Sequence, residues 1–375
     1  HRLSTEICSY AFALLIGLKE QFNKIGNTTH NFHQAIAIFT KNENFIAEKL
    51  VKACRFTAEI TRYDGKVPQI GDNDSGRFFI IEPIWKVTKV KEAKKTYDNL
   101  KNYNDLPDET NHYEMETLDH SHLLAAISSV IRCENYPLNE VISRQYKIES
   151  SVVSQIACRK RINCKIEVCE LKTKEITLKD MPYQFSQNIT LPNYLKEDEW
   201  KQVLFPDFGL YILKQPKAYI SFRLGPSQLR DRASHMHEDA LSLEIVIEDF
   251  ISIQDVGSYV YTAEPILRNA YRSMQAHFSP FEKSTVFYYL KDGLFSYKAC
   301  PKIKALNLKE KGIEVLLNRN ESKIFCSLNI VKNSIELAIA SNVKENFCWK
   351  RRLKVPYSEG YGIIKKDYKE CSSLV

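Results

Sequence analysis

The stretch that decides the fold runs from residue 231 to residue 281 and reads DRASHMHEDALSLEIVIEDFISIQDVGSYVYTAEPILRNAYRSMQAHFSPF. Apolar side chains stand at every second position between residues 241 and 247, and this period of two indicates a β-strand with one buried face. Five ionisable side chains lie beside or within such segments: His235, His237, Asp239, Asp255 and His277. Paired strands would bring these groups together in space, although they are far apart in the chain.

Three of these side chains have the chemistry of a zinc site: His237, Asp255 and His277. Zinc accepts imidazole nitrogen and carboxylate oxygen, and ligands carried by a sheet do not need the short spacing of a zinc finger. Asp255 follows His237 by 18 residues and His277 follows Asp255 by 22, enough each time for a strand, a turn and a returning strand. The spacing alone favours ordinary hydrogen-bonded polar residues at strand ends over a zinc site, and both interpretations stay open.

Three motifs in this stretch resemble the central signature of the heparinase II/III-like polysaccharide lyases. Residues 235–244 read HMHEDALSLE, similar to HxHxDALSFEL, and residues 255–262 read DVGSYVYT, similar to DPGTYxYT. Residues 267–277 read LRNAYRSMQAH, similar to LRNxFRSTxAHN. Two positions depart from the pattern: Val256 replaces a proline, and Phe278 replaces the asparagine after the last histidine. The resemblance implies that His237, Asp255 and His277 hold one structural zinc ion and that His235 lies at the edge of a substrate cleft.

This family cleaves acidic polysaccharides by β-elimination at a uronic acid. A base removes the C5 proton and an acid protonates the departing O4. The resemblance assigns this proton work to His1, His235 and Tyr261, because an imidazole near neutral pH can take a proton and a phenol can give one. Tyr261 also fits a packing role between domains, since aromatic side chains often anchor interfaces. Further substrate contacts are expected on the last motif, at Arg268, Asn269 and Arg272.

Two segments near the amino terminus extend the resemblance. Residues 1–18 resemble a helix that begins with a Tyr-His-Arg motif in the family, and residues 67–79, VPQIGDNDSGRFF, resemble a loop of family members found with bacterial exopolysaccharide genes. The resemblance makes Asp72, Asn73 and Arg77 part of the cleft lining, with Arg77 meeting a uronate carboxylate. The alternative is that the aspartate and asparagine side chains only hold a tight loop.

Composition indicates a globular protein with an anionic partner. The 375 residues are 44% apolar and 26% charged, with a net charge of +7. A mild basic excess fits an acidic polysaccharide, and no nucleic-acid-binding motif accompanies it. The ten cysteines lack CxxC spacing, which favours free thiols, and no apolar run reaches the length of a membrane span. Periplasmic and cytoplasmic locations in a bacterium both stay open, as does the oligomeric state.

The periodicities predict an α+β fold of two domains. Helical patterns at 1–19, 45–62 and 121–132 indicate an α/α arrangement, and the resemblance implies that residues 1–135 are an incomplete α/α toroid. Residues 136–200 form a connecting segment, and residues 201–375 form an antiparallel β-sandwich. The basic run 86–95 is interpreted as a solvated helix face. Expected strands cover residues 211–213, 218–223, 241–246, 284–289, 312–318, 323–330, 334–340 and 347–355.

Two functions follow from these expectations. The first is a lyase acting on an acidic polysaccharide. The second is a metal-binding remnant or glycan-binding module, because the chain starts one residue after the tyrosine of the Tyr-His-Arg motif and the family's preceding helices are absent from it. A metal-dependent hydrolase is less favoured, since the sequence has no HExxH motif.

Overall fold

The computed structural model describes residues 2–25, 30–73, 77–100, 102–138, 146–167, 176, 181–225, 235–281, 295, 301–319 and 322–366. The chain folds into two compact units, and neither is continuous in sequence. Unit 1 comprises residues 1–67, 75–87 and 113–170; unit 2 comprises residues 68–74, 88–112 and 171–375. The division at residues 135 and 200 stays a prediction.

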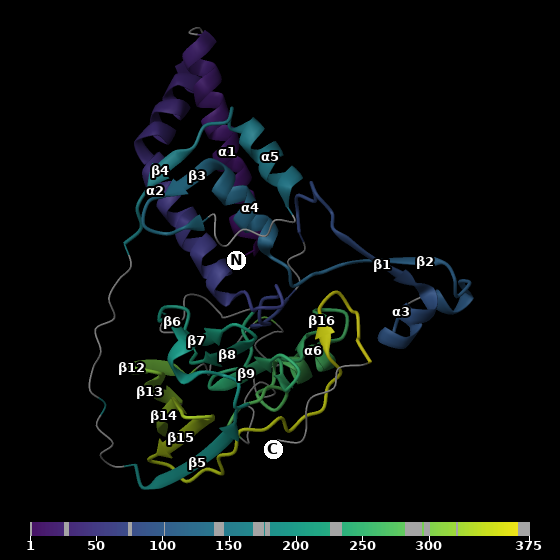
Figure 1. Cartoon of the computed structure of the whole chain (residues 1–375), viewed down its shortest axis with the longest axis vertical. Helices are drawn as coiled ribbons and strands as arrows, with labels where there is room; N and C mark the ends of the chain where they lie inside the picture. Colours follow the sequence, from purple (N-terminus) through teal and green to yellow (C-terminus); the bar gives the residue numbers. More distant parts are fainter. Residues whose placement is uncertain are drawn as a thin grey trace. The chain divides into compact units, whose positions relative to one another are not determined.

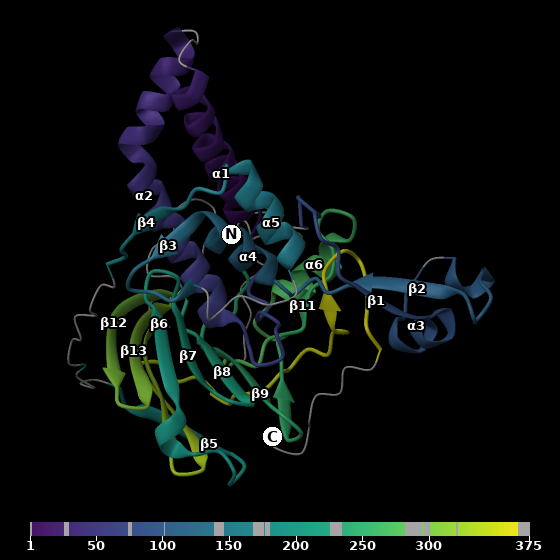
Figure 2. The ribbon, with the colours of Figure 1, turned by 45° about the horizontal axis from the view of Figure 1, so that its top comes forward.

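Unit 1 is mainly helical. Helices α1 (Arg2–Ile25) and α2 (His30–Ile60) pack side by side, and both contact α4 (Ser121–Val130) (Figures 1 and 2). Helix α5 (Lys147–Ile156) packs on α4 and α1. Helix α4, with the sequence SHLLAAISSV, is buried along its whole length, as expected for a helix that is apolar on most of its surface. It therefore forms the centre of this unit.

Two short strands and the half-buried carboxylate of Glu82 complete unit 1. Strands β3 (Ile131–Cys133) and β4 (Ile162–Cys164) pair in parallel. The Glu82 carboxylate accepts hydrogen bonds from the backbone N–H groups of Ile148 and Glu149, in the first turn of α5. These N–H groups have no partner within the helix, so Glu82 stabilises the start of α5.

The predicted helices of unit 1 are real, but several of their boundaries are wrong. Helix α1 continues to residue 25 rather than ending at 19, and α2 ends at residue 60 rather than 62. Helix α2 begins at residue 30 rather than 45, because the polar run at residues 41–44 is exposed or half-buried and continues the helix without interruption. The segment predicted as helix 121–132 ends at residue 130, where the backbone becomes extended and enters β3. Pattern reading misses the last two of these boundaries because neither has a glycine or proline at it.

A strand pair and a short helix occupy residues 85–115. Strands β1 (Trp85–Lys89) and β2 (Asn111–Met115) form a two-stranded sheet, and between them lie α3 (Val90–Thr96) and a 3₁₀ turn (Tyr103–Asp105). The basic run 86–95 is thus half strand and half helix, which corrects the single helix face predicted for it. Its lysines form exposed ion pairs, among them Lys91–Glu109 and Lys94–Asp108.

Unit 2 contains two five-stranded antiparallel sheets. One has the order β10-β9-β8-β7-β6 and the other β12-β13-β14-β15-β5 (Figure 1). The first comprises β6 (Lys201–Phe205), β7 (Leu210–Gln215), β8 (Ala218–Arg223), β9 (Ser242–Ile247) and β10 (Ile251–Ile253). The second comprises β5 (Tyr183–Thr190), β12 (Lys302–Lys309), β13 (Gly312–Arg319), β14 (Ser322–Val331) and β15 (Ser334–Ser341).

The two sheets share one hydrophobic core. Strands β13 and β15 alternate between buried and more exposed side chains, and every residue of β8 and β9 is buried. Side chains from both sheets join a single cluster that includes Ile220, Ile245, Val315 and Leu337. The combination of a helical unit with antiparallel sheets confirms the predicted α+β class.

Several strand predictions need correction. Residues 347–355 form no strand; Lys350 only bridges to Ser279, and Trp349 is buried with its indole N–H donated to the carbonyl of Leu241. Alternation there reflects one large side chain filling the core. Strands β5, β6 and β12 were not expected, and the predicted strand 284–289 lies outside the described residues.

One strand pair joins two segments that are far apart in the sequence, residues 231–281 and the end of the described chain. Strand β11 (Gly257–Ser258) pairs in parallel with β16 (Ser358–Glu359). Gly257 has φ of 78°, and a Cβ there would lie 2.0 Å from the carbonyl oxygen of Ser358, so only glycine fits. None of the helices in the described part of the chain combines the length and apolar character that crossing a bilayer requires.

Candidate functional site

The candidate site of unit 2 is built from four neighbouring segments. They are the loop 68–73, the segment 235–241 that leads into β9, the turn between β10 and β11, and α6 (Pro265–Arg272) with the turn after it. Pro265 starts α6 at the position where a missing N–H costs nothing. The backbone N–H of Glu238 bonds to the carbonyl of Arg272, which fixes the segment before β9 against the end of α6.

The three predicted metal ligands lie together in the interior of unit 2. The rings of His237 and His277 have centroids 5.3 Å apart, and His277 Nδ1 lies 2.5 Å from Asp255 Oδ2. The side chains of both histidines are 1% exposed and that of Asp255 is 9% exposed. The other Asp255 oxygen accepts the backbone N–H of Gly257. The spacing argument was therefore right that these residues meet.

Within this cluster, Asp255 and His277 each favour the charged form of the other. Burial on its own raises the pKa of a carboxyl group, but the charge of His277 and its hydrogen bond hold the pKa of Asp255 below its ordinary value. Burial likewise lowers the pKa of an imidazole, yet Asp255 outweighs this effect and raises the pKa of His277. The two groups thus stabilise each other as an ion pair.

The donor set fits a zinc ion, although the side chains are arranged as a hydrogen-bonded cluster. His237 Nδ1 and His277 Nε2 are both buried and make no hydrogen bond with any residue that the structure describes, and a bound cation is one partner that would satisfy them. Among the described residues, no group of three or more His, Cys, Asp or Glu side chains has the arrangement of a metal site. The zinc ion therefore stays a prediction, with His237, Asp255 and His277 as the residues that would hold it.

Asp72 lies beside this cluster rather than on an open surface. Its side chain is 0% exposed, and its carboxylate contacts His237, His235 and Arg268. Burial favours the protonated carboxyl group, but the hydrogen bond from His237 and the charge of Arg268 lower the pKa of Asp72. The next residue, Asn73, donates its side-chain amide to the carbonyl of Glu359 and its backbone N–H to Ser258.

Two of the predicted proton-transfer residues, His235 and Tyr261, lie next to each other; His235 is exposed, whereas Tyr261 is half-buried and its hydroxyl is buried. The side chain of His235 is 61% exposed, and its ring centroid lies 5.8 Å from that of Tyr261. Phe295 lies at the same distance from His235, and the Arg268 guanidinium is 4.5 Å from the Phe295 ring centroid. Phe295 was not expected from the sequence, because it lies outside the three motifs and no pattern marks it.

The predicted substrate contacts of the last motif are buried. Arg268, Asn269 and Arg272 are 1%, 2% and 2% exposed. Arg272 donates from Nε to the carbonyl of Met236, and Arg268 bonds to Asp72. These contacts support the segment that carries His235, and substrate contact by the three residues stays a prediction.

Arg77 is not part of this cluster. Arg77 belongs to unit 1, where its buried guanidinium forms an ion pair with Glu149 and stacks 4.9 Å from the Tyr146 ring centroid. From the family resemblance, Arg77 was expected to bind the carboxylate of a uronate. In the structure the guanidinium of Arg77 is instead neutralised by a carboxylate of the protein, that of Glu149. His1 lies outside the described residues.

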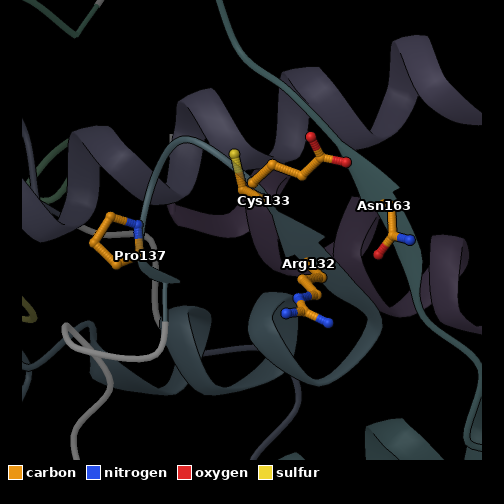
Figure 3. Close-up of a pocket in the computed structure, with 5 residues that line it drawn as sticks. Arg132, Cys133, Pro137 and Asn163 are labelled. Atoms are coloured by element: carbon orange, nitrogen blue, oxygen red, sulfur yellow. The ribbon is translucent and has the colours of Figure 1, made fainter.

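Unit 1 contains a pocket of about 490 Å³ beside the β3–β4 pair (Figure 3). Arg132 and Cys133 come from β3 and Asn163 from β4, and Glu134 and Pro137 complete the lining. None of these five residues belongs to the predicted site, and none of them is a histidine or tyrosine that could carry out the expected proton transfers.

Comparison with protein families identifies the region that holds the candidate site. The family model described as Heparinase II/III-like, C-terminal, matches residues 197–279. This range extends from the turn before β6 to the turn after α6, so it includes the segments of His235, Asp255 and His277. No curated protein and no solved structure matches the chain. The match confirms the family resemblance on which the site was predicted.

Proposed function

We propose, from the premise that residues 197–279 are a heparinase II/III-like C-terminal domain, that this chain is a lyase of acidic polysaccharides. It would cleave next to a uronic acid by β-elimination and serve bacterial exopolysaccharide metabolism. In this proposal the helices of unit 1 are part of an α/α toroid, and the two five-stranded sheets of unit 2 are the β-sandwich of the family.

The observation that carries the proposal is the placement of an acid and a base side by side, the half-buried Tyr261 next to the exposed His235. His235 and Tyr261 have ring centroids 5.8 Å apart, within the reach of two neighbouring atoms of one sugar ring. Both residues lie within the range that matches the family. An imidazole and a phenol at this separation supply the two proton transfers that elimination needs.

The proposed reaction assigns one step to each residue. His235 accepts the C5 proton of the uronate at the imidazole nitrogen that does not face Asp72. The electron pair left at C5 forms the C4–C5 double bond as the C4–O4 bond breaks. Tyr261 donates its phenolic proton to the departing O4. A zinc ion held by His237, Asp255 and His277 would act as a structural support for the segments that carry these two residues.

The test is ultraviolet absorbance of the unsaturated uronate product. The purified full chain is mixed in turn with alginate, heparan sulfate, hyaluronan and bacterial exopolysaccharide. We expect absorbance to rise with at least one of them, and His235→Ala and Tyr261→Phe each to lower kcat by about 10²-fold or more. Both variants keep the buried cluster intact, so their circular dichroism spectra serve as a folding control.

Two results would contradict the proposal. If no polysaccharide yields an unsaturated product although the chain is folded, the chain is not a lyase, and saturable glycan binding in the same samples would identify it as a binding module. If cleavage occurs but is unaffected by both substitutions, the chemistry lies elsewhere in the chain.

A further inference from the structure

We infer that Asp72 is a positioning residue that orients His235 and links it to His237, and that it does not contact substrate. The catalytic part of this inference rests on the proposed function. The link between the two histidines does not, because it follows from contacts within unit 2.

Both oxygens of the Asp72 carboxylate are occupied by protein groups. Oδ1 lies 3.0 Å from His237 Nε2, whereas Oδ2 lies 3.3 Å from His235 Nδ1 and 2.5 Å from Arg268 Nη2. The side chain is fully buried. An ionised and buried carboxylate has no hydrogen-bond donor for a uronate and is not accessible to it. Its negative charge would also repel the substrate carboxylate.

The backbone of the loop is fixed to the same histidine. The N–H of Asp72 donates to the carbonyl of His235 at 3.0 Å. Gly71 permits this approach, because its φ is 70° and a Cβ there would lie 2.4 Å from the His235 carbonyl oxygen. Asn73 then bonds to Ser258. The loop is therefore fixed on both sides of Asp72, so the carboxylate has one position relative to His235.

This arrangement determines which nitrogen of His235 is available. An acceptor at Nδ1 keeps the proton of the neutral ring on that nitrogen, which leaves the Nε2 lone pair directed away from Asp72. The side chain is 61% exposed, so without Asp72 the ring would rotate and exchange between its two tautomers. The same carboxylate holds His237, so the reactive edge and the buried cluster move as one body.

The experiment compares Asp72→Asn with a matched control, Glu314→Gln. Glu314 lies on β13, outside the four segments of the site, and both of its carboxylate oxygens are also held by protein groups, Lys309 and Asn307. For Asp72→Asn we expect kcat to fall by about 10²-fold while KM changes less than about threefold, because orientation of the base is lost and substrate binding is retained. Asp72→Glu keeps the charge and is expected to restore part of kcat, and Glu314→Gln is expected to retain it.

A second readout needs neither substrate nor metal. Nitrogen NMR of ¹⁵N-histidine-labelled chain, at a pH where the ring is neutral, reports the tautomer of His235, assigned through His235→Ala. We expect the Nδ1–H form in the wild-type chain and a mixture of both forms in Asp72→Asn. An unchanged tautomer in Asp72→Asn, or equal losses of kcat in Asp72→Asn and Glu314→Gln, would overturn the inference. If the wild-type chain cleaves no polysaccharide, the proposed function fails, while the NMR result still decides the role of Asp72.

Discussion

Replacing Glu149 with glutamine is expected to destabilise unit 1 by about 3–5 kcal/mol, because it removes one charge of a buried ion pair and leaves the other. The carboxylate of Glu149 is 0% exposed and the guanidinium of Arg77 is 1% exposed. Glutamine has nearly the same shape, and its amide oxygen can still accept the hydroxyl of Tyr10, which lies 2.7 Å from Glu149 Oε1. The loss is thus confined to the uncompensated charge of Arg77.

The double variant Arg77→Met/Glu149→Gln separates this effect from packing. With both charges removed, no buried ion remains without a partner, so the double variant is expected to recover most of the loss. Glu20→Gln is the surface control, since the pair Lys160–Glu20 is 58% and 25% exposed and is worth less than about 1 kcal/mol.

The assay is guanidinium unfolding followed by far-ultraviolet circular dichroism, with one transition fitted for each unit. The helical signal reports mainly unit 1. The reasoning is refuted if Glu149→Gln lowers the free energy of unfolding by no more than the surface control. It is also refuted if the double variant loses as much as the two single variants added together, because the two side chains would then not be coupled.

Three further predictions concern the core and the thiols. Trp349→Phe leaves the buried carbonyl of Leu241 without its donor and should cost about 1–3 kcal/mol in unfolding free energy, whereas a loss near zero would show that the bond is not made. Gly257→Ala places a Cβ 2.0 Å from a backbone oxygen of β16, and it should expose the β11–β16 pair to hydrogen–deuterium exchange, compared with wild type by mass spectrometry. Burial raises the pKa of the Cys326 thiol, so iodoacetamide at mildly alkaline pH should label exposed Cys8 and spare Cys326; equal labelling in native protein would contradict the fold.

Much of the site was predictable because its residues belong to short motifs with fixed spacing. The strand period around β9 placed these residues beside strands, but the spacing alone was a weak signal, and it was the family resemblance that grouped His237, Asp255 and His277. The structure brings the three side chains together, and the family match at residues 197–279 covers the same stretch. Motifs suffice here because the residues that meet are carried by neighbouring strands and turns.

The roles of Asp72 and Arg77 were not predictable from pattern. Both lie in the loop that reads IGDNDSGR, and both have side chains that usually remain in solvent. Each is buried instead by partners distant in sequence: Asp72 by Arg268 and two histidines, and Arg77 by Glu149. Periodicity carries no information about which buried charge meets which, so a polar loop cannot be distinguished from a cleft lining at this level.

The pairing of β11 with β16 can form only late in synthesis, because β16 lies near the end of the described chain. Ser258 must meet Glu359 and Asn73, segments about a hundred or more residues away on either side, before the loop of Asp72 is fixed. Contacts of such separation form slowly, because the ends of long chain segments must first find each other. On the ribosome, the strands of both sheets would emerge before this closing contact is possible. Until residues 358–359 emerge, β11 would therefore lack its partner strand and Asn73 its bond to Glu359.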